Sequence, residues 1–200
     1  REKEFAGQLG LSRNSLREAI RALSLIRVLD VRHGDGTYVA SLRPETLLES
    51  LSFAAEVAQD EAIAEQFEVR RLLEPAATAL AATRISDEQL AELVSCIDRM
   101  ERADTPEDLV RDDIDFHDTI VAAAGNQTLA SLCRGLSSRT ARVRVWRVAV
   151  EEGAVEWTHS QHRAIYRALV ERDSTLALAA ATVHVADVER WLRRWRGATP

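Results

Sequence analysis

The chain has 200 residues, of which 46% are hydrophobic and 29% charged, an ordinary composition for one large or two modest globular domains. It contains neither an apolar run of about 18 residues nor a signal-peptide pattern, so we expect a cytoplasmic protein without membrane contact. Its two cysteines, Cys96 and Cys133, fall within helical patterns and are predicted to be reduced core or boundary residues.

The formal net charge of −6 hides an asymmetry along the chain. Residues 1–43 carry eight Lys and Arg against five Asp and Glu, whereas residues 44–200 carry 18 against 27. A small basic segment is therefore joined to a larger acidic one. A negative net charge of the whole chain argues against binding to nucleic acid, but the basic segment alone is suited to it.

The basic segment is predicted to be mixed in secondary structure. A short helix over residues 2–9 is followed by a turn, and Ser12 is a suitable N-cap for a helix over residues 13–26. Leu16, Ile20 and Leu23 lie on one face of that second helix. Residues 28–32 and 37–40, around a glycine-rich turn, predict a β-hairpin.

After Pro44 the pattern is helical to the end of the chain. Capping signals such as Ser86 with Gln89, and Thr105 before Pro106, mark several helix starts. The predicted helices span residues 45–58, 61–83, 87–103, 106–124, 127–150, 154–172 and 175–195. We expect a mostly α protein in two domains, with residues 1–43 as a helix-turn-helix unit and residues 44–200 as an all-α antiparallel bundle.

The exposed face of the second helix has the composition of a DNA-reading surface. Arg13, Asn14, Ser15 and Arg17 lie off the apolar stripe near the helix start, which is the end that reaches base edges in helix-turn-helix proteins. Arginine suits guanine or phosphate contacts. The alternative is a solvated basic helix beside a surface hairpin.

Two runs of sequence resemble the winged helix-turn-helix of the GntR family. They are the Ser-Arg-x-x-hydrophobic-Arg-Glu-Ala run within residues 2–23 and the His-Gly-x-Gly-Thr run within residues 31–39. The resemblance implies binding to double-stranded operator DNA, with contacts at Lys3, Ser12, Arg13, Ser15, Arg17, His33 and Gly34.

Two positions depart from the family pattern. Lys3 stands where the family usually has arginine, and Arg27 stands where it usually has glycine. The family also has a helix before the segment that begins here, so the resemblance predicts a winged helix-turn-helix truncated at its start, with its first helix missing.

Three histidines and one carboxylate are predicted to point inward in the acidic segment. Asp113 and His117 are four residues apart on one helix face, while His162 and His184 lie on the apolar stripes of two other helices. Burial of such groups is costly unless they are paired or bind a metal, and this set suits Zn²⁺, or else Ni²⁺, Mn²⁺ or Fe²⁺. The alternative for each histidine is a satisfied core residue, and His159 is predicted at the rim.

The Asp113–His117 segment, the Ala-Gly-Asn run that ends at Asn126, the segment starting at His162, and His184 together resemble the FCD sensor domain of the FadR-type GntR subfamily. The resemblance places the metal ligands at Asp113, His117, His162 and His184. Asp112 and Asp115 are adjacent alternatives to Asp113, but Asp112 falls on another helix face and Asp115 turns outward.

A metal in this site would leave coordination positions open for a small carboxylate effector. Arg70 is predicted to contact that effector, although an ion pair with Glu74 explains it equally well. Asn126 is either a helix cap or a pocket amide. Arg139, with Arg142 on the same arginine-rich helix, is predicted either to reach the carboxylate or to be solvated.

These observations predict a homodimeric, ligand-responsive regulator of transcription that is not an enzyme and that reads a two-fold related operator. The alternative is a metal-dependent enzyme acting on a small organic acid, because a metal with open positions can activate water. A third hypothesis is an interaction module that has lost DNA binding.

Overall fold

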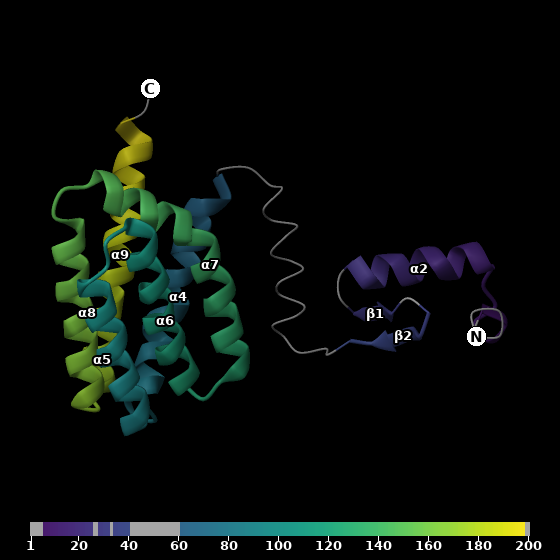
Figure 1. The fold of residues 1–200 in the computed structure, drawn as a ribbon, viewed down its shortest axis with the longest axis horizontal. Helices are drawn as coiled ribbons and strands as arrows, with labels where there is room; N and C mark the ends of the chain where they lie inside the picture. The colour runs from purple at the N-terminus through teal and green to yellow at the C-terminus, as the bar shows by residue number, and fades with distance from the viewer. Residues whose placement is uncertain (1–5, 26–27, 33, 41–60, 199–200) are drawn as a thin grey trace. The chain divides into compact units, whose positions relative to one another are not determined.

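The computed structural model describes residues 6–25, 28–32, 34–40 and 61–198 (Figure 1). The chain divides into two compact units, Arg1–Ala58 and Gln59–Pro200, and each is considered by itself. The predicted helix over residues 45–58 and the predicted domain boundary at Arg43 and Pro44 lie outside the described residues. The division into 1–43 and 44–200 therefore stays a prediction.

The first unit contains a helix, a turn, a second helix and a hairpin. Residues 6–8 are helical, and helix α2 (Arg13–Leu25) begins after Ser12, whose Oγ accepts a hydrogen bond from the Ser15 amide at 3.1 Å. Strands β1 (Leu29–Arg32) and β2 (Gly36–Val39) pair antiparallel. Gly34 supplies the positive φ of 80° that the turn between them requires. The predicted helix-turn-helix and wing are confirmed here.

The second unit is a bundle of six described helices (Figure 1). They agree closely with the predicted spans: α4 (Glu61–Ala82), α5 (Asp87–Glu101), α6 (Pro106–Ala123), α7 (Gln127–Val150), α8 (Ala154–Val170) and α9 (Ser174–Ala198). Short connections of three to four residues join successive helices, which explains their up-and-down arrangement. Helix α4 packs most extensively against α9, which brings the two ends of the unit's sequence together.

The helix starts follow from the capping residues. Ser86 and Gln89 form a reciprocal capping box at α5, and Thr105 caps α6 ahead of Pro106. Asn126 caps α7 by accepting a hydrogen bond from the Leu129 amide at 3.0 Å. These local bonds explain why the helix boundaries could be predicted so well from sequence.

The bundle interior consists of apolar clusters with a buried polar region among them. The largest cluster surrounds Leu93, Phe116 and Ile165, and another surrounds Phe67 and Trp191. Cys96 and Cys133 are buried free thiols, as predicted. Among the described residues, no helix is both long and apolar enough to cross a membrane.

Candidate metal and effector site

The four predicted metal ligands meet in the bundle interior. Asp113 and His117 come from α6, His162 from α8 and His184 from α9. One ligand atom from each residue lies within 4.8 Å of all the others, and every one of the four side chains is buried. Three helices that are distant in sequence therefore bring together one carboxylate and three imidazoles.

The separations of these donor atoms suit a shared cation. Asp113 Oδ1 lies 3.0 Å from His162 Nε2 and 3.5 Å from His117 Nε2, and His117 Nε2 lies 3.1 Å from His184 Nε2. Two atoms that are each bonded to one zinc-sized ion lie about 3 to 3.5 Å apart. His162 Nε2 has no hydrogen-bond partner of acceptable geometry among the described residues, although it is buried.

Gln161 orients one of the imidazoles. Its Oε1 lies 3.0 Å from Nδ1 of His184, and both side chains are buried. Because an amide oxygen only accepts, this contact assigns the proton of His184 to Nδ1 and leaves the Nε2 lone pair facing His117. An outer hydrogen bond of this kind is the usual support of a metal-binding histidine.

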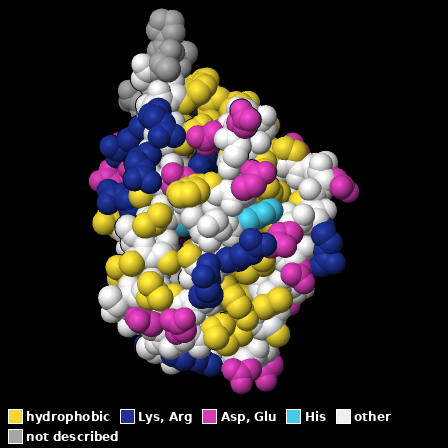
Figure 2. Space-filling view, turned by 90° about the vertical axis from the view of Figure 1, so that its left-hand side faces the viewer, with side chains coloured by type: hydrophobic (Ala, Val, Ile, Leu, Met, Phe, Trp, Pro, Cys, Tyr) yellow, Lys and Arg dark blue, Asp and Glu magenta, His cyan; other side chains and the backbone are white. Residues whose placement is uncertain are grey.

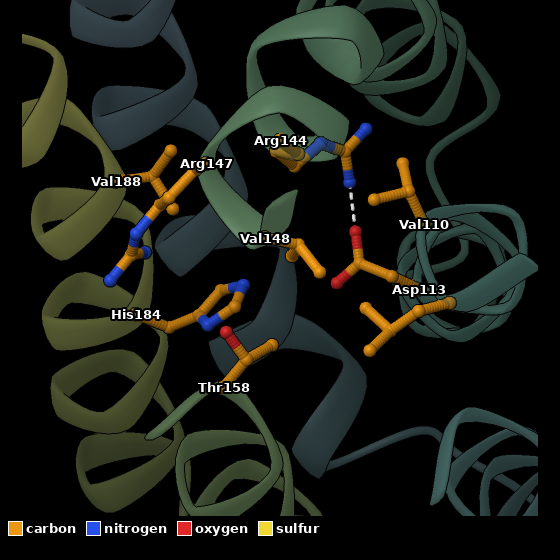
Figure 3. Close-up of a pocket in the computed structure, with 9 residues that line it drawn as sticks. Val110, Asp113, Arg144, Arg147, Val148, Thr158, His184 and Val188 are labelled. Atoms are coloured by element: carbon orange, nitrogen blue, oxygen red, sulfur yellow. Dashed lines mark hydrogen bonds and ion pairs between the residues drawn. The ribbon is translucent and has the colours of Figure 1, made fainter. Parts of the chain in front are cut away.

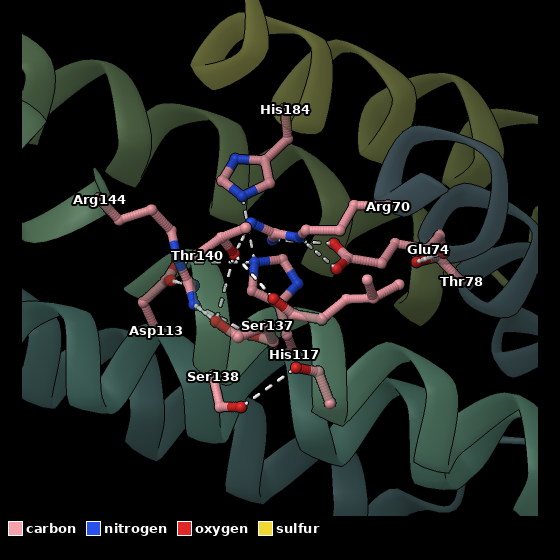
Figure 4. A network of polar contacts seen from close by, with 12 residues as sticks. Arg70, Glu74, Thr78, Asp113, His117, Ser137, Ser138, Thr140, Arg144 and His184 are labelled. Carbon is pink, nitrogen blue, oxygen red and sulfur yellow. Dashed lines mark hydrogen bonds and ion pairs between the residues drawn. The ribbon is translucent and has the colours of Figure 1, made fainter. Parts of the chain in front are cut away.

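Arg144 of α7 holds the carboxylate of Asp113 from the opposite side. Its Nη1 forms a short ion pair with Oδ2, while Nη2 donates to the backbone oxygen of Ser137 at 2.6 Å (Figure 4). Burial alone would raise the pKa of Asp113, but Arg144 and the contacts with His117 and His162 hold that pKa well below 3.8. Asp113 is therefore an anion with one oxygen toward the histidines and the other toward Arg144.

Burial favours the neutral form of His184 and of His162. Burial lowers the pKa of His184 well below 6.5, and the neighbouring His162 and His117 lower it further. Burial also lowers the pKa of His162, against the opposing effect of Asp113. A neutral imidazole has the free lone pair that metal coordination requires.

Arg70 is buried in a network of hydrogen bonds with Glu74 and Thr140. Its Nε and Nη2 donate to the two carboxylate oxygens of Glu74 at 2.7 and 3.1 Å, and Nη1 donates to Thr140 Oγ1 at 2.7 Å (Figure 4). Burial raises the pKa of Glu74, but the charge of Arg70 and its hydrogen bonds outweigh burial and lower it. The predicted ion pair is present, and it leaves Arg70 few donors for an effector.

A small cavity opens beside Asp113 and His184 (Figure 3). The space that the centre of a water-sized sphere can occupy in this cavity is about 20 Å³. The residues that line it include five with polar side chains, Asp113, Arg144, Arg147, Thr158 and His184, and four aliphatic ones, Leu109, Val110, Val148 and Val188. A ligand in this cavity would touch two of the four candidate metal ligands.

The other predicted effector residues lie elsewhere. Asn126 caps α7 and lines a separate cavity at the turn between α6 and α7. Arg139 does not line the cavity beside Asp113; its Nε and Nη2 are buried and have no hydrogen-bond partner within the described part of the chain. Arg142 is exposed. Contacts of these residues with an effector stay predictions.

Three nearby residues of similar chemistry, Asp112, Asp115 and His159, are not part of the cluster. Asp112 is buried but pairs with Arg99 at 2.9 Å, and Asp115 is exposed, so both point away from the site. His159 is half-buried, three residues before His162 on α8, and is not part of the four-residue cluster; burial lowers its pKa and Glu101 opposes that effect. The choice of Asp113 over its two neighbours agrees with this geometry.

The predicted DNA-contacting residues that can be located are exposed on the first unit. Ser12, Arg13, Ser15 and Arg17 lie at the start of α2, and Gly34 lies at the tip of the hairpin. Lys3 and His33, like the unusual Arg27, lie outside the described residues. Ser12 and Ser15 also contact each other, with their Oγ atoms 2.8 Å apart.

The surface of the bundle is mixed in charge. Figure 2 shows acidic, basic and hydrophobic side chains interspersed on one face, with basic side chains gathered at the upper left. Near the end of α9, Trp191 is buried while Trp195 is 45% exposed and stacks edge-on against Trp146. Trp191 therefore belongs to the interior of the bundle, while Trp195 covers part of its surface.

Sequence reasoning missed Arg144 and Gln161. The available signal was the spacing of α7, where Ser137, Thr140, Arg144 and Arg147 follow steps of three or four residues and are all buried. That stripe is polar, so a search for apolar periodicity passes over it. Gln161 had a weaker signal, its position next to His162.

The fold and the buried cluster define a two-part protein in which a winged helix-turn-helix unit is joined to a helical sensor-type bundle. The family models agree: residues 65–187 match the FCD domain, and residues 1–39 match the bacterial regulatory proteins of the gntR family. The chain belongs to the GntR family of regulators that carry an FCD domain, consistent with the FadR-type subfamily, and it is a transcriptional regulator of that type.

Known relatives extend over nearly the whole chain. The HTH-type transcriptional regulator LutR of Bacillus subtilis (strain 168) is 27% identical over 192 residues, which cover 92% of this chain and 86% of LutR. The galactonate operon transcriptional repressor of Escherichia coli (strain K12) is 28% identical over 198 residues, covering 96% and 86%. The solved structure of Streptococcus agalactiae GntR has a TM-score of 0.68 and 29% identity, covering 95% and 87%.

Proposed function

We propose that this regulator senses a small carboxylate through a divalent metal ion held by Asp113, His117, His162 and His184. The observation that carries the proposal is the convergence of four buried donor atoms within 4.8 Å, from three helices. Zn²⁺ is the first candidate, and Ni²⁺, Mn²⁺ and Fe²⁺ accept the same donors. The bound ion would supply a positive charge partner for the effector's carboxylate.

The charge balance of the site supports an anionic effector. The buried guanidinium groups of Arg70 and Arg144 balance the carboxylates of Glu74 and Asp113, and the coordinating histidines must be neutral. A divalent ion therefore leaves two uncompensated positive charges in a buried region. An incoming carboxylate would reduce that excess, which favours acids over neutral ligands. The name of one relative also refers to an acid, galactonate.

DNA recognition is proposed for the exposed start of α2 and for the wing. Arg13 and Arg17 would contact base edges or phosphates, with Ser12, Ser15, Lys3, His33 and Gly34 as further contacts. A homodimer would present two such units to a two-fold related operator. The relatives are named as regulators, which lends no support to the alternative of a metal-dependent enzyme.

Metal analysis tests the sensor half of the proposal. Purified wild-type chain, loaded with Zn²⁺ and desalted, should retain about one ion per chain. His162→Ala should retain almost none, because a ligand is lost, whereas His159→Ala should retain as much as wild type because His159 is not one of the four candidate ligands. Equal metal in His162→Ala and wild type would refute the site.

A gel-shift experiment tests the regulatory half. The metal-loaded full-length protein is titrated into DNA from upstream of its own gene, with and without a panel of small carboxylates. We expect a specific shift whose midpoint moves with an effective acid, and no such movement in His162→Ala. A wild-type chain that shifts no specific DNA at any salt concentration would refute the role proposed for α2. Turnover of the acids would instead support an enzyme.

A further inference from the structure

Two adjacent helices of the bundle share an outer surface that lacks exposed charge over several turns. From Leu72 to Thr83, the sequence of α4 contains one charged residue, Glu74, and its side chain is buried. Residues 174–186 of α9 contain no Asp, Glu, Lys or Arg, although 29% of the residues in the chain are charged. Depletion of charge from a surface is typical of the centre of a protein interface.

Helices α4 and α9 lie side by side and run in opposite directions (Figure 1). In the first half of α4, Arg71 pairs with Glu189 at 2.9 Å, and at the end of α4 Ala81 shares an apolar cluster with Ala177. The outward positions of both helices therefore form one continuous surface, called the α4–α9 face below. Its exposed and half-buried members are Val69, Leu72, Ala76, Ala79 and Leu80 of α4 with Leu178, Ala179, Thr182, Val183 and Ala186 of α9.

The α4–α9 face is apolar and large enough for a stable interface. Leu72 is 62% exposed and Val183 is 50% exposed, although both side chains are aliphatic. The alanines between them are short enough to let another pair of helices approach closely. From Glu65 to Thr83, α4 rises about 28 Å, and two adjacent helices are about 20 Å wide, so the face approaches the roughly 800 Å² that each partner of a standard interface buries.

One end of the face has charges that a second copy of the chain could complement. Glu68 is exposed on α4 and Arg190 is exposed on α9, and both lie within about one helical turn of the Arg71–Glu189 pair. The acid belongs to one helix and the base to the other, at the same level of the bundle. A copy turned about a two-fold axis parallel to the helices would bring each acid opposite the base of its partner.

We infer that two copies of this chain pair through the α4–α9 face, with α4 of each copy against α9 of its partner. The inference rests on the homodimer of the proposed function and goes beyond it by assigning the surface and the axis. This axis also places Glu61, where α4 begins, at the same end in both copies, as two reading units on one operator require. A two-fold axis across the helices would instead place the two starts of α4 at opposite ends.

Sedimentation equilibrium of the zinc-loaded full-length protein tests the surface. Wild type should form a dimer. Leu72→Asp puts a carboxylate from each copy into the apolar interface and should weaken the dimer at least about 100-fold. Val94→Asp adds the same charge at a 38% exposed side chain of α5, which packs against α6 and α8, and should dimerise as wild type does.

A charge reversal tests the axis. Glu68→Arg alone and Arg190→Glu alone should each weaken the dimer by about 3- to 10-fold, because like charges then face each other. The variant that carries both changes should regain most of the lost affinity, because the pair is restored with opposite polarity. Two single losses that simply add in the double variant would refute the parallel axis.

The outcomes separate the α4–α9 face from the metal site. Wild type that stays monomeric at every concentration would overturn the inference, and so would equal dimerisation of Leu72→Asp and Val94→Asp. Zinc retention, measured on the same samples, should be equal in all of them, because the four candidate ligands come from one chain. A wild type that dimerises through this face and retains no zinc would refute the proposed metal site and support the inference.

Discussion

The two units place their functional residues in opposite environments. In the first unit, the described candidates for DNA contact are exposed, and the contact between Ser12 and Ser15 is a local one. In the bundle, the candidate ligands are buried and rely on distant partners: Asp113 pairs with Arg144, 31 residues away, and His184 with Gln161, 23 residues away.

The two environments favour different ways of recognising a partner. Exposed arginines remain hydrated until DNA binds. They therefore contribute to the free energy of DNA binding and hardly at all to the free energy of folding. A buried charged cluster must be held in place before the ligand arrives, because an unpaired buried charge is costly. Substitutions in the two units should therefore separate binding effects from stability effects.

The largest expected effect is on the folding of the bundle. Arg144→Met leaves the carboxylate of Asp113 buried without its ion pair and should lower the free energy of unfolding by about 3–5 kcal/mol in metal-free protein. Arg142→Met, on the exposed face of the same helix, should change it by less than about 0.5 kcal/mol. Urea unfolding followed by tryptophan fluorescence measures both, because all four tryptophans lie in the bundle. Equal losses in the two variants would contradict the buried-pair interpretation.

The next effect is on metal affinity. Gln161→Met removes the acceptor that orients His184, and zinc affinity should fall by about 10- to 100-fold in a chelator competition. The matched control is Gln127→Met at the exposed start of α7, which should bind zinc as wild type does. If Gln161→Met binds zinc normally, the imidazole is oriented by other contacts.

In the first unit the expected effect is confined to DNA. Arg13→Ala should weaken operator binding by about 1–3 kcal/mol while the unfolding of the bundle stays unchanged. Arg102→Ala, an exposed arginine of the bundle, is the control for loss of general positive charge. If both variants weaken operator binding equally, the attraction is nonspecific, and DNA recognition is not confined to the first unit.

The smallest effect distinguishes two roles of Asn126. Asn126→Ala removes the cap of α7 and should cost about 1 kcal/mol of stability, whereas Asn126→Asp retains an accepting oxygen and should cost less. Effector affinity, measured by calorimetry, should be the same in both variants, because Asn126 lines a different cavity from that beside Asp113. A loss of effector affinity in Asn126→Asp without a loss of stability would support the other hypothesis, in which the Asn126 amide contacts the effector.

The sequence predicted local features well because local forces determine them. The helix spans, the caps at Ser86 and Thr105, and the inward direction of Asp113 and His117 follow from hydrogen bonds and periodicity within a few residues. The four candidate ligands were named from the same periodicity together with a family resemblance.

What could not be predicted depends on packing between distant helices. Arg139, Arg142 and Arg144 are chemically identical and lie within six residues, yet of these three only Arg144 lines the cavity beside Asp113. The rotation of α7 decides this, and its buried stripe of polar residues carries no hydrophobic signal. Likewise, the hydrogen bond from Arg70 to Thr140 joins residues that are 70 positions apart in the sequence.

The divided carboxylate of Asp113 has a thermodynamic consequence. One oxygen faces the imidazoles and the other faces Arg144 at the cavity, so metal and effector would share a single side chain. In the proposed function the two are therefore linked ligands: whatever factor the metal adds to effector affinity, the effector must add to metal affinity. Sensitivity to the metabolite would then rise and fall with the free metal concentration around the protein.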